Sequence, residues 1–257
     1  MDRLYRVEVE GRFTRVVERD GEWNELIGDP FGSYQLGDTI DPNVIRILPP
    51  VVPSKIVAVG LNYRDHAKEM GKELPDEPLI FLKPSTAVIG TEESIVIPTG
   101  AGRVDHEAEL GVVIGRTARH VTAAKAHEHV LGLTCVNDVT DRELQRRDVQ
   151  YTRGKGFDTF APVGPAIAVG LEASSLDVSS SVNGVNRQSS NTRELIFPVE
   201  RLVEFVSAVM TLLPGDIIST GTPSGVGPLV PGDRVVVKVE GVGELANDVV
   251  ADREGQS

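Results

Sequence analysis

The chain has 257 residues, of which 40% are hydrophobic and 25% are charged, as in globular proteins that bury a core. Its net charge of −12 argues against nucleic acid or anionic membranes as partners. No apolar run approaches the roughly 18 residues that span a bilayer. The first residues carry no apolar segment of the signal-peptide type, so we expect a cytoplasmic protein. The single cysteine, Cys135, excludes an internal disulfide, and its apolar neighbours favour a core position.

The first part of the chain predicts short strands. Apolar and polar residues alternate in LYRVEVEG and in FTRVVERDGEWNEL. The prolines of ILPPVVPSK then indicate a connector, so we expect a small N-terminal β domain over residues 1–49 and a main domain over residues 50–257. In the main domain the predicted strands are KIVAVGLNY, SIVIP, AELGVVIGR, GLTCVNDV, PAIAVG, DVSSSVNGVNRQ, GDIISTGTP and GDRVVVKVEGVG. The Asn-Gly pair in VNGV predicts a tight hairpin.

Few segments predict helices. They are RDHAKEMGKE, TAAKAHEHVLG behind a capping Thr122, DRELQRRDVQYT, and PVERLVEFVSAVMTLL with Pro198 at its first helical position. The regular alternation of strand and helix that builds parallel sheets is missing from the pattern. We therefore expect a mainly β fold with a few helices, of the α+β class.

Acidic residues mark the ends of two predicted strands. Glu107 and Glu109 point to one face of a strand, because successive side chains alternate. Two such carboxylates repel each other unless one is protonated or a cation lies between them, and a hard divalent cation prefers oxygen ligands. A solvent-facing strand end explains this spacing equally simply. Asp138 follows another apolar strand and is a third candidate, with Asp141 as an alternative ligand and helix capping as an alternative role for Asn137 and Asp138.

Other residues suggest catalytic or binding groups. His66 and Glu69 share a helix face, where the carboxylate would fix the imidazole tautomer for general-base catalysis; an exposed surface pair is the alternative. His106 is expected to face away from the two glutamates and is not assigned as a ligand. Lys155, between two glycines, would neutralise an anionic substrate or polarise a carbonyl, unless it is a surface-loop lysine. Backbone N–H groups and Thr222 of STGTPSGVGPL would bind a carboxylate.

Seven segments in order, from about Lys55 to Asn247, resemble the fumarylacetoacetate hydrolase family. They are KIVAVGLNYRDHAKEMG, PLIFLKPSTAVIG, DHEAELGVVIG, VNDVTDRELQ, GKGFDTFAPVGP, VNGVNRQ and PGDIISTGTPSGVGP. The resemblance implies a mixed β-sandwich-like roll and a homodimer. It implies Mg²⁺ or Mn²⁺ held by Glu107, Glu109 and Asp138. It assigns catalytic roles to His66 and Glu69 on a lid helix and to Lys155, and substrate contacts to Arg142, Gln145 and Thr222.

The resemblance also narrows the branch of the family. True fumarylacetoacetate hydrolases have a large N-terminal domain and a further aspartate ligand in the motif equivalent to GLNYRDHA. This chain has about 50 residues ahead of its motifs, and Leu61, Asn62 and Tyr63 supply no acid there. We therefore expect a member of the small-substrate branch.

The resemblance implies an enzyme that acts on a small 2-oxo acid through a metal-stabilised enolate. Hydrolysis of an acylpyruvate or decarboxylation of oxaloacetate is the first expectation. Isomerisation of 2-hydroxyhepta-2,4-diene-1,7-dioate and dehydration of a 2-keto-3-deoxy sugar acid are the alternatives. Outside enzymes, the alternative is a non-catalytic β-rich binding module that keeps a metal for stability.

Overall fold

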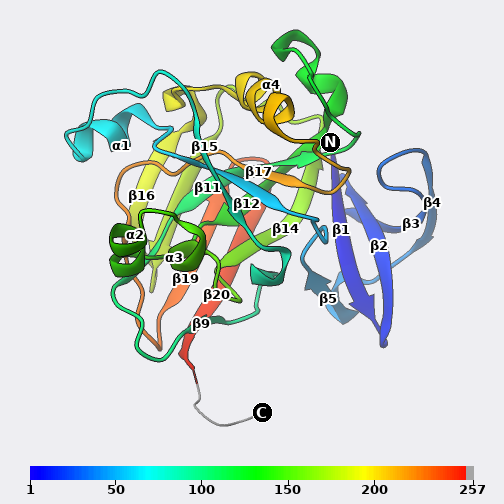
Figure 1. The fold of residues 1–257 in the computed structure, drawn as a ribbon. Coiled ribbons are helices and arrows are strands. Elements are labelled where there is room, and N and C mark those ends of the chain that lie inside the picture. The colour runs from blue at the N-terminus through cyan, green and yellow to red at the C-terminus, as the bar shows by residue number, and fades with distance from the viewer. Residues whose placement is uncertain (253–257) are drawn as a thin grey trace.

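A computed structural model describes residues 1–252 of the chain, and strands dominate it (Figure 1). The largest sheet is built from β1 (Asp2–Val9), β2 (Arg12–Arg19), β3 (Glu22–Gly28), β4 (Tyr34–Thr39), β5 (Ile45–Leu48), β6 (Ile56–Gly60), β7 (Leu79–Lys83), β8 (Val88–Ile89), β11 (Ala108–Ile114), β12 (Val130–Asn137), β14 (Ala161–Val169) and β17 (Ile217–Ser219). Its strand order is β4-β3-β2-β1-β14-β12-β11-β17-β6-β7, with β5 paired to β1 and β8 to β14.

Two smaller sheets accompany the large one. The five-stranded sheet has the order β16 (Val185–Asn191), β15 (Asp177–Val182), β19 (Arg234–Val239), β20 (Gly243–Ala251) and β9 (Ile95–Ile97). The three-stranded sheet has the order β13 (Thr140–Asp141), β10 (Val104–His106) and β18 (Gly227–Pro228). The predicted mainly β class is confirmed.

Helices are short and lie between the strands. The α-helices of residues 1–252 are α1 (Arg64–Glu69), α2 (Arg142–Asp148), α3 (Thr152–Lys155) and α4 (Val199–Val209). The 3₁₀ helices are η1 (Pro42–Val44), η2 (Ser85–Ala87), η3 (Ala123–His129) and η4 (Thr192–Glu194). No helix in this part of the chain is long and apolar enough to cross a membrane.

Two details of the predicted helices are wrong. Within residues 122–132, Ala123–His129 form the 3₁₀ helix η3 rather than an α-helix, Val130 begins β12, and the Thr122 side chain makes no capping hydrogen bond. Pro198 is the cap residue in front of α4, not its first helical residue, because its extended backbone leaves Val199 to begin the helix. The helical turns predicted for segment 141–152 are confirmed as α2 and the start of α3, which are separated at Val149, whose positive φ of 63° ends α2.

The large sheet buries both of its faces, which explains the continuous apolar sequence of its central strands. Val112 of β11 faces a core that contains Leu202 of α4 and Val237 of β19. Its neighbour Val113 faces the opposite core, which contains Leu4 and Val17 of the N-terminal strands. The central strands therefore lie between two apolar layers.

The N-terminal strands continue the large sheet rather than forming a sheet of their own. Leu4 of β1 pairs with Ile167 of β14. The N-terminal strands β1 to β5 lie together at one side of the molecule (Figure 1). The predicted boundary after residue 49 stays a prediction. The predicted VNGV hairpin is confirmed: Asn183 and Gly184 both have positive φ, of 52° and 76°, between β15 and β16.

Candidate metal centre

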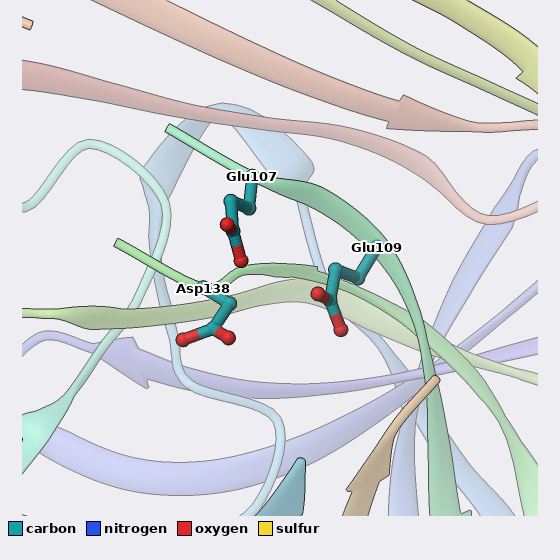
Figure 2. Close-up of side chains that lie close together, drawn as sticks. All are labelled: Glu107, Glu109 and Asp138. Carbon is teal, nitrogen blue, oxygen red and sulfur yellow. The ribbon is translucent and has the colours of Figure 1, made fainter. Parts of the chain in front are cut away.

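Three carboxylates meet at the ends of neighbouring strands (Figure 2). Glu107 lies in the break between β10 and β11, Glu109 lies in β11, and Asp138 directly follows β12. The register that pairs Ala108 with Asn137 sets the acids of the two strands beside each other. One oxygen atom from each carboxylate lies within 4.8 Å of the other two, and all three side chains are buried. The structure thus brings together the three acids that the sequence singles out.

Asp141, the alternative ligand candidate, caps a helix instead. Asp141 Oδ1 accepts hydrogen bonds from the backbone N–H groups of Glu143 and Leu144 at 2.9 and 3.0 Å, so it caps α2. Its other oxygen accepts from Gly102 N at 3.1 Å. The cap of this helix is therefore Asp141, and the capping role considered for Asn137 and Asp138 is wrong.

Glu109 carries the least compensated carboxylate of the three. Its Oε2 accepts hydrogen bonds from Ser219 Oγ at 2.6 Å and from Gly221 N at 2.8 Å. Burial raises the pKa of Glu109 well above its usual value, and the charges of Asp138 and Glu107 raise it further. A divalent cation between the carboxylates would remove this repulsion and favour the ionised form. The buried trio therefore suits a hard cation.

Two buried lysines lie against Asp138. Lys155 Nζ donates to Asp138 Oδ2 at 2.6 Å, to Glu107 Oε2 at 2.9 Å and to Thr140 Oγ1 at 2.7 Å. Lys83 Nζ forms an ion pair with the other oxygen, Asp138 Oδ1. Lys155 is only 2% exposed, so its alternative reading as a surface-loop lysine is wrong. Burial lowers the pKa of Lys83, whereas Asp138 and Glu107 outweigh burial and raise the pKa of Lys155.

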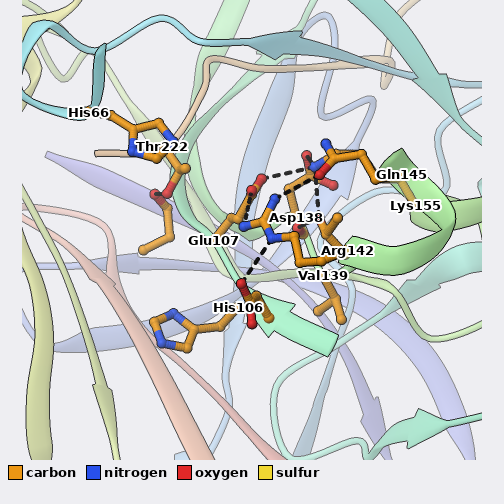
Figure 3. A network of polar contacts seen from close by, with 12 residues as sticks. His66, His106, Glu107, Asp138, Val139, Arg142, Gln145, Lys155 and Thr222 are labelled. Carbon is orange, nitrogen blue, oxygen red and sulfur yellow. Dashed lines mark hydrogen bonds and ion pairs between the residues drawn. The ribbon is translucent and has the colours of Figure 1, made fainter. Parts of the chain in front are cut away.

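Arg142 connects Glu107 to two further polar groups (Figure 3). Its Nη2 lies 2.6 Å from Glu107 Oε1, its Nε donates to Asp105 Oδ2 at 2.9 Å, and its Nη1 donates to Gln145 Oε1 at 3.1 Å. Burial alone would raise the pKa of Glu107, but Lys155 and Arg142 hold it far below its usual value. Glu107 is therefore ionised with or without a cation, in contrast to Glu109.

The pair on α1 is formed as its spacing predicts. His66 Nδ1 lies 2.9 Å from Glu69 Oε2, and the carboxylate partner makes Nδ1 the protonated nitrogen. Glu69 Oε1 also accepts a hydrogen bond from Gly225 N at 3.2 Å. At the start of the helix, Asp65 Oδ2 accepts from Ser190 Oγ at 2.7 Å. His66 is buried, so the exposed-surface alternative does not describe it.

Gln188 is a buried residue to which the sequence patterns assign no role. Its Nε2 donates to Thr222 Oγ1 at 2.8 Å, and its Oε1 accepts from Ala108 N at 2.9 Å. Thr222 Oγ1 in turn donates to Ala108 O at 2.9 Å, so its hydroxyl proton is already committed. His106 is buried beside Gln188, 3.2 Å from Oε1. Only the appearance of Gln188 in VNGVNRQ singles it out in the sequence.

Asn62 occupies the segment where a fourth acid is expected in true fumarylacetoacetate hydrolases. Its Nδ2 donates to Thr220 O at 2.7 Å and to Phe197 O at 3.1 Å, and its Oδ1 accepts from Phe197 N at 2.8 Å. The amide is thereby used to hold two loops together. Within residues 1–252, the acidic cluster contains three ligand candidates and no fourth.

A cavity of about 490 Å³ opens in front of the three acids. Eight of the nine predicted site residues line it, namely His66, Glu107, Glu109, Asp138, Arg142, Gln145, Lys155 and Thr222. Glu69, the ninth, stands behind His66. An apolar part of the wall is formed by Leu61, Met70, Leu79, Phe81 and Val149. Carboxylates, a histidine, positively charged side chains and apolar side chains thus line one space, which suits a small organic acid.

Comparison with known proteins identifies the relationship. Residues 55–250 match the family described as fumarylacetoacetate (FAA) hydrolase C-terminal. The chain belongs to this family. A mitochondrial oxaloacetate tautomerase of Bos taurus is 42% identical over 219 residues, which cover 80% of this chain and 70% of the relative.

Solved structures agree over nearly the whole chain. The 5-carboxymethyl-2-hydroxymuconate delta-isomerase of Mycobacterium smegmatis is 45% identical with a TM-score of 0.92, covering 97% of this chain and 100% of that one. A maleylpyruvate hydrolase of Sphingobium, solved with manganese(II) and pyruvate, is 31% identical with a TM-score of 0.81, covering 98% and 100%. The manganese in that relative and the buried acids here together indicate a divalent-cation site. The chain is therefore a small-substrate member of its family.

Proposed function

We propose that this protein is a divalent-metal-dependent enzyme that moves a proton between the keto and enol forms of a small 2-oxo acid. The observation that carries the proposal is His66, which lines the same cavity as the acidic trio while Glu69 holds its Nδ1. A base fixed in one tautomer opposite a cation site suits the formation of an enol. The names of the two more similar relatives, a tautomerase and an isomerase, favour proton transfer over the C–C cleavage expected first from the sequence.

Glu107, Glu109 and Asp138 would hold the cation. Mg²⁺ and Mn²⁺ both accept this all-carboxylate set, so we propose either metal. When bound, the cation would stabilise negative charge that develops on the 2-oxo oxygen. The metal in the hydrolase relative is manganese, which supports testing Mn²⁺ first.

The protein's own groups would handle the proton. His66 Nε2 removes a proton from carbon 3 of the keto form and then delivers it to the oxygen of the resulting enolate, which gives the enol. Glu69 orients the ring and balances the imidazolium that forms in between. Lys155, fixed by Asp138, Glu107 and Thr140, adds positive charge next to the developing enolate. Arg142 and Gln145 orient the substrate from α2.

Hydrolysis of an acylpyruvate is the second candidate. The manganese-containing maleylpyruvate hydrolase relative favours it, and the same His66–Glu69 pair would activate a water molecule. Decarboxylation of oxaloacetate would use the same stabilised enolate. Both of these reactions release pyruvate, whereas tautomerisation does not.

The test separates these reactions in one experiment. The purified protein is stripped with EDTA, reloaded with Mg²⁺ or Mn²⁺, and given oxaloacetate or an acylpyruvate. Ultraviolet absorbance follows the enol, and a coupled lactate dehydrogenase assay follows pyruvate. Metal-dependent loss of enol absorbance without pyruvate supports tautomerisation. Release of pyruvate at the same rate as the enol is lost would instead support C–C cleavage and contradict tautomerisation.

The His66→Ala variant tests the base. We expect the rate of enol conversion to fall by about 10²- to 10⁴-fold, the usual contribution of a general base. Mn²⁺ affinity, measured by calorimetry, should stay unchanged because His66 is not a ligand. His129→Ala is the matched control, because that half-buried histidine does not line the cavity and its side chain bonds to the backbone of Thr117. Full activity of His66→Ala would remove His66 from the mechanism.

A further inference from the structure

Gln188 lies outside the cavity, yet its side chain reaches both the strand that carries the acids and the loop that carries Thr222. It belongs to β16 of the five-stranded sheet and is completely buried. The pairing of β16 with β15 skips Arg187, so a β-bulge directly precedes Gln188. Bulges commonly redirect a side chain beside a functional site. The irregularity of β16 therefore falls where it can direct the Gln188 amide.

The amide of Gln188 uses all of its hydrogen-bonding capacity. Its Nε2 donates to Thr222 Oγ1 and to Pro223 O, both at 2.8 Å. Its Oε1 accepts from Ala108 N at 2.9 Å and from Ser180 Oγ at 3.0 Å. A rotated amide would set its NH₂ group against the N–H of Ala108 and its oxygen against Pro223 O. The amide is therefore held in a single orientation.

Ala108 lies between the two glutamates of the acidic trio, and side chains hold its backbone. The pairing of β11 with β17 covers residues 111–113, so Ala108 lies beyond that ladder. Its N–H donates to Gln188 Oε1, and its O accepts from Thr222 Oγ1, both at 2.9 Å. These two side chains thus satisfy the backbone groups that a neighbouring strand would otherwise pair. They fix the backbone from which the two carboxylates project.

The same amide also holds the loop that follows β17. Gly221 N donates to Glu109 Oε2 at 2.8 Å, so this loop supplies one of the hydrogen bonds to that carboxylate. The next two residues, Thr222 and Pro223, are the acceptors of the Gln188 NH₂ group. Gln188 is thereby connected to Glu109 in two ways, through the backbone of its strand and through the donor to its side chain.

We infer that Gln188 is a positioning residue for the metal site, because it fixes the relative position of the Glu107 and Glu109 carboxylates through Ala108. The inference rests on the proposed function, of which the cation is part. Neighbouring buried carboxylates repel each other, so the protein must hold them at the separation that suits a cation. Residues that orient ligands without touching the metal typically contribute 10- to 100-fold in metal affinity.

The Gln188→Met variant gives the first test. Methionine is similar in length and volume to glutamine, but it cannot replace the amide hydrogen bonds to Ala108, Thr222 and Pro223. Calorimetry should find that Mn²⁺ binds the variant about 10- to 100-fold more weakly than the wild-type protein. The electron paramagnetic resonance spectrum of the bound Mn²⁺ should also change in shape, because the carboxylates surround the ion differently.

Thr222 provides a second test from the other side of Ala108. Thr222→Val removes the hydroxyl that donates to Ala108 O, whereas Thr222→Ser keeps it. Thr222→Val should weaken Mn²⁺ binding, and Thr222→Ser should bind Mn²⁺ as the wild-type protein does. The double variant, Gln188→Met with Thr222→Val, should lose less affinity than the product of the two single losses, because both side chains act on the same backbone.

Asn247 is the matched control for loss of a buried amide. It lies in β20, is 1% exposed, and does not line the cavity. Its Nδ2 donates to Gly90 O and Glu93 O, each at 2.8 Å. Asn247→Leu should lower the urea midpoint, as Gln188→Met does, and leave the Mn²⁺ affinity and the resonance spectrum unchanged.

The outcomes separate this inference from the proposed function. Wild-type Mn²⁺ affinity in folded Gln188→Met protein would overturn the inference, and so would an equal loss of affinity in Asn247→Leu. If Gln188→Met does not fold, Thr222→Val decides, since unchanged Mn²⁺ affinity in that variant would also overturn it. Failure of the wild-type protein to bind Mn²⁺ would refute the proposed function at its metal site, and this inference with it.

Discussion

Glu107 and Glu109 are two residues apart and point into the same space, yet their surroundings drive their pKa values in opposite directions. Lys155 and Arg142 touch Glu107 and keep it ionised. Among residues 1–252, Glu109 has only a hydroxyl and a backbone N–H as donors, and burial and the neighbouring acids raise its pKa. Without a cation, the electrostatic cost of burying the acids therefore falls mainly on the ionised form of Glu109.

The Glu109→Gln variant should remove the pH dependence of stability that this cost produces. The pKa of Glu109 in the folded protein lies above its unfolded value of 4.5, so the stability it contributes is present at low pH. That stability is lost as the pH rises from the unfolded pKa through the folded pKa, by up to about 1.4 kcal/mol per pH unit. Without metal, the wild-type protein should therefore lose unfolding free energy relative to Glu109→Gln as the pH rises above the unfolded pKa of 4.5.

Urea unfolding at several pH values measures this difference. Saturating Mn²⁺ should abolish the difference in slope, because it keeps Glu109 ionised in the wild-type protein and binds the variant weakly. Glu244→Gln is the control, since Glu244 is an exposed acid paired with Lys238. Parallel curves for the metal-free wild-type and Glu109→Gln proteins would contradict the raised pKa.

Short-range patterns in the sequence predict part of this site and miss the rest. The spacing of His66 and Glu69 is local, and the structure forms that pair. Lys83 and Asp138 are 55 residues apart, and nothing in PLIFLKPSTAVIG indicates that its lysine would be buried against an acid. Asp105 and Gln188 are missed for the same reason: their partners are set by how distant strands pair. The roles of the three acids as ligands stay a prediction from family resemblance.

At the scale of elements, α2 connects the metal end of the cavity to its mouth. Arg142 and Gln145 lie on it, and Asp141 caps its first turn. Asp141→Ala should lower the free energy of unfolding by about 1 to 2 kcal/mol, the cost of losing an N-cap. Because Arg142 and Gln145 would be less well oriented, KM for the substrate should also rise.

Asp141→Asn is the matched variant, because its amide oxygen can still accept from Glu143 and Leu144. Calorimetry should find normal Mn²⁺ affinity for both variants. A loss of Mn²⁺ affinity in Asp141→Asn with unchanged stability would instead make Asp141 a ligand, the alternative that the sequence left open.

Elements were predicted best where the signal lies within a few residues. The Asn183–Gly184 turn is such a case, because both residues tolerate a positive φ. Segment 122–132 shows the limit: its composition favours an α-helix, yet Ala123–His129 fold as a 3₁₀ helix that packs against α4 and places Ala126 in the main core. Tertiary packing overrides helix propensity there.

At the scale of the whole molecule, the order of the strands depends on contacts between distant parts of the chain. β17 lies between β11 and β6, and β14 lies between β1 and β12. No pattern within a strand encodes these neighbours, so the sequence predicts the class of the fold but not its sheet order. The same strand order joins the N-terminal strands to the strands that carry the acids.

This continuity predicts one cooperative unfolding transition. Leu4 and Val17 share a core with Val113 of β11, the strand that carries Glu109. Trp23, the single tryptophan of the chain, lies in β3 and reports on the N-terminal strands. If the molecule unfolds as a unit, Mn²⁺ bound at the distant acids should also shift the urea midpoint of Trp23 fluorescence. At 100 times the dissociation constant, the expected stabilisation is about 2.7 kcal/mol.

The comparison uses Trp23 fluorescence and far-ultraviolet circular dichroism on the same samples, with and without Mn²⁺. The two midpoints should coincide and move together. Leu4→Ala should lower both by removing about 2 to 5 kcal/mol of core packing, whereas Leu36→Ala on the exposed edge strand β4 should lower neither appreciably. A Trp23 fluorescence transition at lower urea than the circular dichroism transition, with a midpoint that Mn²⁺ does not shift, would contradict this expectation. It would show that residues 1–49 unfold as the separate small domain that the proline-rich connector suggests.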